Sequence, residues 1–267
     1  MVYVLLAAVV VVYAFPLYWT AVTSLKSLPE MTAKPPTLWP KAPLLANYRE
    51  IFVATYFTRY AWNSLIVAIG TSLLTVTLAV AAAFSLARFA FVGRRLLGHG
   101  ILTVYLFPGI LLVTPLYVVM MRLGLYDTLW SLILVDVLYS LPFAVWTLRA
   151  FIDGVPRELE ECARIDGASW MQVLVRVYAP LLKPALATTA IYAFVIAWNE
   201  YLFASVLVTG QASQTLPVGL AGWTSSYTIN WGQVSAASIL SLVPTVLFFT
   251  TLGPLFVKGL TQGAVKG

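Results

Sequence analysis

Charged side chains are scarce in this chain of 267 residues: Asp, Glu, Lys and Arg make up 10% of it. Soluble domains carry about 25% charged residues. Hydrophobic residues account for 61%, and the mean hydropathy is +0.89. This composition excludes an ordinary soluble enzyme, a nucleic-acid-binding module and a disordered chain. The net charge of +6 does not indicate nucleic-acid binding, because the basic residues are scattered between apolar runs.

Reactive side chains are equally few. One cysteine, Cys162, excludes an internal disulfide, and one histidine, His99, excludes a histidine-based zinc cluster. The sequence has no P-loop motif with which to bind ATP phosphates. Paired acids and nucleophile–base pairs are also missing from the pattern. We therefore expect a chain that is not an enzyme, with no catalytic residue, metal site or cofactor of its own.

Long uncharged runs indicate several membrane-spanning helices. Crossing roughly 30 Å of hydrocarbon at 1.5 Å per residue takes about 20 apolar residues. Charged residues, together with a polar and Gly-rich stretch at 209–232, divide the chain into runs of this length. We predict an all-α polytopic membrane protein with six transmembrane helices, near 2–22, 62–87, 98–121, 130–149, 185–208 and 233–257.

The distribution of Lys and Arg predicts the orientation of these helices. The loops at 88–97 and 149–184 and the tail at 258–267 share one side and hold ten basic residues, whereas the other side holds six. Because cytoplasmic loops carry an excess of Lys and Arg, the first side should be cytoplasmic. Both termini are then expected in the cytoplasm, and 23–61 is the longest extracytoplasmic connection.

Two acidic residues interrupt the predicted helices. Each costs about 2.5–3.5 kcal/mol at the bilayer centre on insertion scales, so each should face protein or water. Glu200, which follows Asn199 in the fifth predicted span, is a candidate either for the translocation path or for a buried structural hydrogen bond. Asp136 lies nearer the outer end of its span and is expected to reach interfacial water.

Two extracytoplasmic segments have patterns of their own. Residues 47–57 predict a short amphipathic helix, which we interpret as a cap over the bundle. The stretch 209–232 combines hydroxyl and amide side chains with Trp223, Tyr227 and Trp231. This mixture suits a sugar, whose ring has polar edges and apolar faces. It also suits a membrane-surface loop with an aromatic belt, which is the commoner case.

The predicted cytoplasmic loop at 151–184 has the most informative pattern. Pro156 suits the first position of a helix, and the acids that follow it favour the positive end of the helix dipole. Gly167 should break that helix. The next segment places apolar residues three, four and seven positions after Trp170, which predicts a second, amphipathic helix. Such a helix pair either merely links two spans or docks on a cytoplasmic partner.

The residues of this loop resemble the EAA motif of binding-protein-dependent ABC importer permeases. The motif is E-A-A, three residues, G, nine residues and I-x-L-P; this chain has Glu161-Cys162-Ala163, Gly167, Val177 and Pro180 in register. Cys162 and Ala179 depart from the pattern, and both are small. Further pieces resemble the carbohydrate-uptake branch of the family: TSLK at 23–26, NY at 47–48, NS at 63–64, ARIDGA at 163–168, WNE at 198–200 and GLTQGAVKG at 259–267.

The resemblance implies a type I (MetI-like) importer permease in a prokaryotic inner membrane. A first helix at 1–22 would precede the extracytoplasmic connection at 23–61 and a five-helix transmembrane domain at 62–257. The implied partners are two cytoplasmic ABC ATPase subunits that bind the ATP, a second permease subunit, an extracytoplasmic solute-binding protein and membrane lipid, with no nucleic acid. The implied coupling residues are Glu161, Cys162, Ala163, Asp166, Gly167, Ala168 and Pro180; the candidates for the translocation path are Asn199 and Glu200.

Two alternatives to a sugar importer stay open at the level of sequence. The loop motif alone does not distinguish a sugar permease from an ABC permease for another solute. An ion-coupled carrier, a different class of transporter, would need no docking loop and usually shows a repeat across its halves. We see no such repeat in this sequence.

Overall fold

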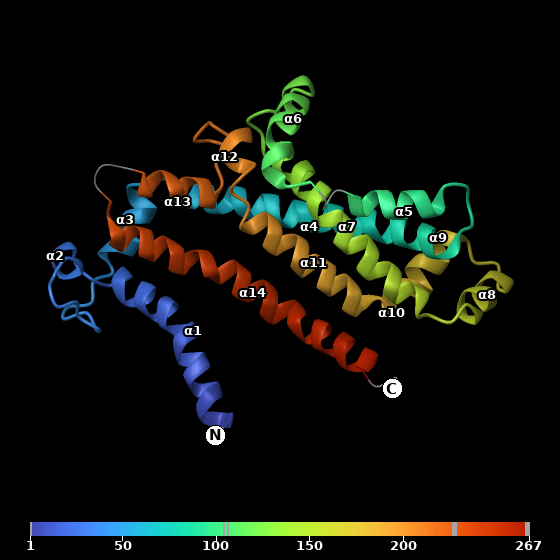
Figure 1. The fold of residues 1–267 in the computed structure, drawn as a ribbon, viewed down its shortest axis with the longest axis horizontal. Coiled ribbons are helices and arrows are strands. Elements are labelled where there is room, and N and C mark those ends of the chain that lie inside the picture. The colour runs from blue at the N-terminus through green and yellow to red at the C-terminus, as the bar shows by residue number, and fades with distance from the viewer. Residues whose placement is uncertain (1, 104, 106, 226–228, 265–267) are drawn as a thin grey trace. The chain divides into compact units, whose positions relative to one another are not determined.

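A computed structural model provides the structure of the chain (Figure 1). It describes all residues except 1, 104, 106, 226–228 and 265–267, and the side chains up to residue 254. In this part of the chain the regular structure is helical, with no strand. The predicted all-α class is therefore confirmed.

Two compact units make up the chain. One comprises Met1–Asn63 and Gly210–Val246, and the other comprises Ser64–Thr209 and Leu247–Gly267. Two of the three boundaries fall inside long helices, because both α4 (Phe57–Arg88) and α14 (Trp231–Ala264) contribute to the two units, and the third falls between Thr209 and Gly210, outside any helix.

Four helices are long and apolar enough to cross a membrane: α1 (Val2–Ser24), α4, α7 (Leu129–Asp153) and the Trp231–Pro254 part of α14. They correspond to the predicted first, second, fourth and sixth spans. The apolar part of α1 is exposed along its length. Since apolar surface is unfavourable in water, this helix needs lipid or another subunit around it. Helix α14 continues to Ala264 and so extends into 258–267, which we predict to be a cytoplasmic tail; residues 265–267 lie outside the described part.

The predicted third span, 98–121, is not one helix, and the expectation of a continuous span here was wrong. The structure has α5 (Arg94–Thr103) and α6 (Gly109–Arg122) instead. Pro108 stands at the N-cap of α6; proline has no backbone N–H and disfavours a helical conformation in the residue before it. At 1.5 Å per residue the 14 residues of α6 are too short to cross the hydrocarbon alone.

The predicted fifth span, 185–208, is also divided. Helix α11 (Lys183–Trp198) ends before Asn199, and the four-residue α12 (Ala204–Leu207) follows. At its other end α11 is bent by 83° from the preceding segment Trp170–Leu181. The described residues thus contain four long apolar helices, or five when that bent pair is taken as one span. The count of six spans stays a prediction.

In the second unit, α7 and α11 lie side by side (Figure 1) and α4 packs with them. Hydroxyl groups join these helices: Thr75 and Ser140 are 2.7 Å apart, and Ser72 donates to the carbonyl oxygen of Ala190 at 3.0 Å. Buried alanines such as Ala83 give close helix contacts, as small residues do in membrane bundles. Asp136 is 2% exposed in this packing, so the expectation that it reaches interfacial water was wrong.

The first unit contains the short helices α2 (Leu28–Met31), α3 (Ala46–Val53) and α13 (Leu216–Thr224). Helix α3 confirms a short helix in the predicted range 47–57, but it ends at Val53, and Phe57 already begins α4. Asn47 at its start donates to the carbonyl oxygens of Ser24 and Lys26, at 2.8 and 3.0 Å, which ties the end of α1 to α3. The polar stretch 209–232 is not only a loop, because α13 lies within it. Tyr227 lies outside the described residues.

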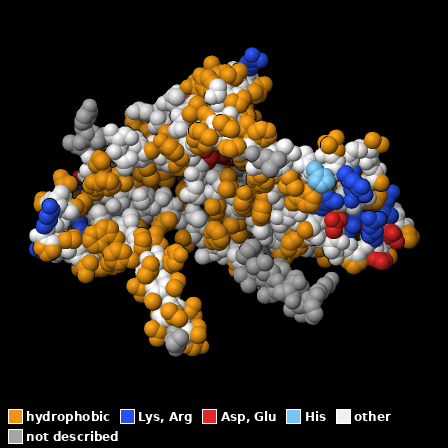
Figure 2. All heavy atoms as spheres, viewed as in Figure 1, with side chains coloured by type: hydrophobic (Ala, Val, Ile, Leu, Met, Phe, Trp, Pro, Cys, Tyr) orange, Lys and Arg blue, Asp and Glu red, His pale blue; other side chains and the backbone are white. Residues whose placement is uncertain are grey.

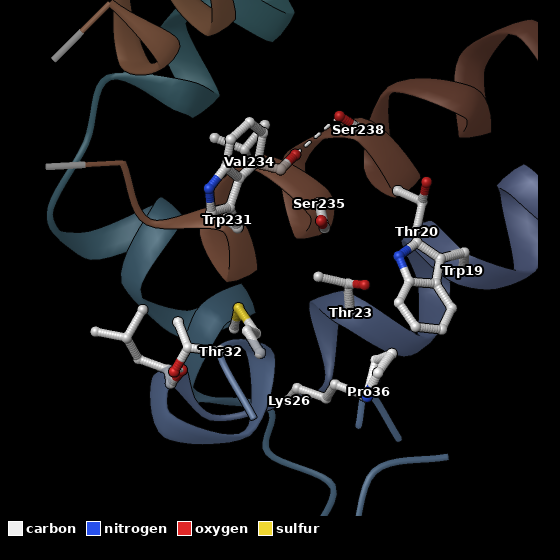
Figure 3. Close-up of a pocket in the computed structure, with 12 residues that line it drawn as sticks. Trp19, Thr20, Thr23, Lys26, Thr32, Pro36, Trp231, Val234, Ser235 and Ser238 are labelled. Atoms are coloured by element: carbon white, nitrogen blue, oxygen red, sulfur yellow. Dashed lines mark hydrogen bonds between the residues drawn. The ribbon is translucent and has the colours of Figure 1, made fainter. Parts of the chain in front are cut away.

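A cavity of about 570 Å³ in the first unit lies between α1, α2 and the start of α14 (Figure 3). Trp19 and Trp231 line it together with the hydroxyl side chains of Thr20, Thr23, Thr32, Ser235 and Ser238. The Lys26 amine donates to the carbonyl oxygen of Thr37 and lies 4.5 Å from the centre of the Trp19 ring. These two contacts account for the burial of a lysine at this end of α1.

Candidate functional site

The loop between α7 and α11 begins with α8 (Glu158–Ile165), whose first turn holds three acids, Glu158, Glu160 and Glu161. The helix ends in a Schellman motif: Gly167 donates its backbone N–H to Arg164 and Ala168 donates to Ala163, both at 3.0 Å. Gly167 has φ +84°, a left-handed conformation that is strained for residues with a Cβ. The predicted break at Gly167 is confirmed, with this backbone geometry as its cause.

A capping box starts the second helical segment only two residues later. Ser169 accepts from the backbone N–H of Gln172 at 3.3 Å, and the Gln172 side chain accepts from the Ser169 N–H at 2.7 Å. Arg164 of α8 reaches across the corner, donating to the carbonyl oxygen of Ala168 at 2.6 Å and lying 4.9 Å from the centre of the Trp170 ring. Two local motifs and one side chain therefore fix the angle between the segments.

The second segment packs against the end of α4 through its predicted apolar face. It runs through α9 (Trp170–Gln172), the π-helix Val173–Tyr178 and α10 (Ala179–Leu181). Val173 of the predicted apolar face is buried and Arg176 of the opposite face is exposed, in agreement with the predicted amphipathic pattern; Tyr178, which was not part of that pattern, is buried as well. Ring centroids lie 5.2 Å apart for Phe84 and Tyr178 and 5.0 Å apart for Phe89 and Trp170. The sequence did not reveal the π-helical turn.

A buried ion pair joins α8 to the last residue of α4. Arg88 Nε lies 3.0 Å from a carboxylate oxygen of Glu160, and the two side chains are 3% and 10% exposed. Arg88 Nε also donates to the Tyr178 hydroxyl at 2.7 Å, and that hydroxyl donates to Glu160 at 2.6 Å. Arg88 Nη2 donates to the carbonyl oxygens of Ile152 and Val155, both at 2.7 Å. We call Arg88, Glu160 and Tyr178 the loop clamp.

In the clamp, the Glu160 carboxylate is paired with the Arg88 guanidinium and accepts a hydrogen bond from the Tyr178 hydroxyl. Burial, followed by the hydrogen bond to Glu160, raises the pKa of Tyr178 to about 12. The phenol therefore keeps its proton at neutral pH and donates it to the carboxylate. A buried ion pair is costly to break, by about 3–5 kcal/mol, because the remaining charge is left without a partner. The clamp thus fixes the inner face of α8 to α4, to the end of α7 and to the π-helix.

The opposite face of α8 is exposed. It presents Glu161, Cys162 and Ile165, and the Ile165 side chain is 84% exposed. Of the other predicted coupling residues, Asp166, Gly167 and Pro180 are exposed, and Ala163 and Ala168 are half-buried. Charged side chains of both signs gather at the end of the second unit that carries α8 (Figure 2). The outward face of α8 thus combines an exposed isoleucine with the acid Glu161.

The two candidates for the translocation path lie at a helix break rather than inside a span. The carboxylate of Glu200 accepts from the backbone N–H groups of Phe203 and Ala204, at 2.7 and 2.8 Å. These bonds compete with a continuous helix, which explains why α11 ends at Trp198. Asn199 is exposed, and its amide donates to the carbonyl oxygen of Val195 at 2.8 Å. Glu200 is thus hydrogen-bonded within the structure, one of the two outcomes expected for it.

The clamp was missed at the level of sequence, although its residues were visible. Arg88 lies 72 positions before Glu160 in the chain, and no local pattern pairs residues at such a separation. One sequence signal was available: adjacent residues of a helix point in different directions, so Glu160 and Glu161 could not both lie on the same face of α8. Ile165 was also missed, and its signal was a large apolar residue in a helix rich in charged residues.

Residues 76–261 match the protein family described as binding-protein-dependent transport system inner membrane component. The chain belongs to that family. The matched range contains α7, the whole loop and α11. This permease is therefore a membrane component of a transport system, and it works together with other subunits.

Similar proteins cover nearly the whole chain. The inner membrane ABC transporter permease protein YcjP of Escherichia coli K12 is 38% identical over 98% of this chain and 94% of its own. The trehalose transport system permease protein SugB of Mycobacterium tuberculosis is 38% identical over 98% and 96%. The trehalose/maltose transport system permease protein MalG of Thermococcus litoralis is 34% identical over 96% and 93%.

The fold also matches a solved structure. A bacterial ABC transporter involved in the import of the acidic polysaccharide alginate has a chain that superposes with a TM-score of 0.83. The match covers 95% of this permease and 94% of that chain, at 24% sequence identity. This likeness confirms the importer permease fold expected from the sequence.

Proposed function

We propose that this permease forms half of the translocation pathway of an ATP-driven importer for a sugar or oligosaccharide. A second permease subunit supplies the other half, two cytoplasmic ATPase subunits bind the ATP, and an extracytoplasmic solute-binding protein delivers the solute. Support for the sugar comes from the relatives named above, which transport trehalose, maltose and alginate. The permease itself contributes binding surfaces and motion and performs no hydrolysis.

The loop between α7 and α11 is the part that couples the permease to an ATPase subunit. The observation that carries this proposal is the two-faced construction of α8: Glu160 is locked in the clamp, while Glu161, Cys162 and Ile165 point outward. A docking element must be rigid towards its own subunit and free towards its partner. Closure of the ATPase pair on ATP would push α8, and the clamp would pass that displacement to α4 and to the end of α7.

Coupling then follows from linkage rather than from chemistry in this chain. ATP and the loaded binding protein both favour one conformation of the permease pair, so each increases the effect of the other. We place both termini and the loop on the cytoplasmic side, in agreement with the excess of Lys and Arg there.

The break after α11 is our proposal for the polar part of the pathway. Asn199 is exposed at this break, so its amide is available to sugar hydroxyls, which donate and accept hydrogen bonds. Glu200 keeps the break open by binding the backbone of Phe203 and Ala204. In this arrangement Glu200 acts on the solute indirectly, by exposing Asn199.

Reversing the charge of Glu161 tests the coupling role. In the purified complex, Glu161→Lys should reduce the recovered ATPase subunit and lower ATP-driven uptake in proteoliposomes at least tenfold, because a cation faces the partner's surface in place of an anion. Gly167→Pro should have the same effect, since proline removes the N–H that Gly167 donates to Arg164 and forbids a positive φ.

Arg122→Glu is the matched control, an equally exposed charge reversal at the end of α6, away from the loop. It should leave uptake unchanged. Trehalose and maltose, each with the cognate binding protein, are the first solutes to supply. Normal ATPase recovery and normal uptake with Glu161→Lys would contradict the docking role. If the unaltered complex took up neither of these sugars and no oligosaccharide, the proposed solute class would be wrong, and the docking role would be unaffected.

A further inference from the structure

A basic cavity of about 420 Å³ lies between α5 and α7, outside the loop described above. Its lining consists of Arg94, Arg95, Gly98, His99, Trp146 and Arg149. Cavities of about 300–1,000 Å³ are the usual size of small-molecule sites. Three guanidinium groups in such a small lining make a site for an anion, and their fork geometry suits phosphate oxygens.

One side chain of the lining has a donor without an acceptor in the described part of the chain, and the basic side chains beside it have little negative charge near them. Trp146 Nε1 is buried and has no acceptor there. Arg149 has one carboxylate neighbour, Asp153, at 3.6 Å, and the Asp153 side chain is half exposed, so the screened pair neutralises little. His99 Nδ1 is 2.7 Å from the carbonyl oxygen of Arg95, which fixes the ring on α5. The positive charge of the lining thus exceeds the negative charge beside it.

The surroundings of the cavity favour a lipid over a dissolved anion. Helix α5 exposes Leu96 and Leu97, whose side chains are 77% and 56% exposed, directly after its two arginines. A helix with adjacent basic and apolar residues lies at a membrane surface, where leucines contact acyl chains and arginines contact headgroups. A free phosphate or nucleotide would satisfy the arginines but leave these leucines in water.

We propose that this cavity binds the phosphodiester headgroup of an anionic phospholipid in the cytoplasmic leaflet. The phosphate oxygens accept from Arg94 and Arg149, the glycerol backbone lies at the mouth, and the acyl chains run along the exposed leucines of α5. Basic pockets between helices on the cytoplasmic side bind anionic headgroups in this manner. The lipid joins α5 to α7 and thereby braces the segment that precedes α6.

The test measures phospholipid retained by the purified complex in nanodiscs of defined composition. Phosphatidylglycerol should be retained at least tenfold over phosphatidylcholine after stringent detergent washing, as counted by native mass spectrometry. Arg94→Gln with Arg149→Gln should abolish that preference. Arg157→Gln with Arg176→Gln is the matched control, because it removes two exposed charges of the predicted cytoplasmic loop and none from the cavity. The control should keep the preference.

A photoreactive phosphatidylglycerol on the unaltered complex provides an independent measurement should the double variant fail to fold. Its crosslinks should map to peptides of α5 and α7. Equal retention of phosphatidylglycerol by the double variant and the control would overturn the proposal, as would crosslinks confined to other helices. Displacement of the lipid by millimolar inorganic phosphate or ATP would also overturn it, in favour of a dissolved anion. Each readout is independent of sugar uptake, so the proposal stands or falls separately from the transport function.

Discussion

Among single residues, Arg88 has the central place in the loop clamp, because its side chain contacts both other members of the clamp. One guanidinium contacts a carboxylate, a phenol and two backbone carbonyl groups, so it joins the ends of α4 and α7 to both halves of the loop. A lysine could not make these contacts together, because its ammonium is a point charge rather than a planar fork. The same residue follows the predicted span 62–87 on the side that we expect to be cytoplasmic, where basic residues favour that orientation.

The clamp predicts a specific pattern of stability losses. Arg88→Met should destabilise the protein by about 3–5 kcal/mol, because it leaves the Glu160 carboxylate buried without its partner. Tyr178→Phe should cost less, about 1.5–3 kcal/mol, since it removes hydrogen bonds to charged groups while both charges remain paired. Thermal unfolding of the purified complex, followed by intrinsic fluorescence, gives the order of the variants.

The double variant Arg88→Met with Glu160→Met separates the charge effect from lost packing. It should recover part of the stability lost in Arg88→Met, because two apolar side chains replace the pair and no buried charge is left alone. A double variant as unstable as the sum of both single variants would show that the two residues do not interact as the structure has them.

At the scale of elements, the local motifs of the loop could be read from sequence, and the breaks in the spans could not. Gly167 and the apolar spacing after Trp170 are signals that act over a few residues, so they predicted the helix pair correctly, whereas the Ser169–Gln172 capping box was not predicted. The divisions at Pro108 and at Asn199 fall inside long runs of high mean hydropathy, and a hydropathy average over such a run does not distinguish one helix from two. Capping by Glu200 becomes visible only when the backbone after it is known.

Gly167 offers a test of the corner between α8 and α9 in which side-chain clashes play no part. A Cβ built at this position meets no atom within 4 Å, so the cost of Gly167→Ala is conformational alone, about 1–2 kcal/mol for a left-handed residue. Gly167→Asn should be tolerated better, because asparagine adopts this conformation more readily. We expect ATP-driven uptake in the order Gly, Asn, Ala.

Equal uptake by the alanine and asparagine variants, with equal protein levels in the membrane, would show that the positive φ at this corner does not limit coupling. Uptake lower for asparagine than for alanine would point to a partner that contacts residue 167 closely. Either result would require a different account of the angle between the two segments of the loop.

At the scale of the whole molecule, the sequence predicted the class of protein, the loop and four of the spans, whereas the exposure of particular apolar residues had to come from the structure. The apolar part of α1 is wholly exposed, and α8 exposes Ile165 next to Glu161. Both features belong to a subunit whose surfaces are completed by lipid and by other chains. Composition indicates a membrane protein, but it does not indicate which apolar residues face lipid and which face a partner.

The central claim is that the outer face of α8 is covered by an ATPase subunit. Cys162 tests it directly, because it is the only cysteine of the chain and is exposed on that face. Its rate of reaction with a maleimide is measured by mass spectrometry of the α8 peptide, for the permease pair alone and after addition of the ATPase subunits. We predict at least tenfold slower labelling in the full complex. An unchanged rate, in a complex that still hydrolyses ATP and transports solute, would contradict the account.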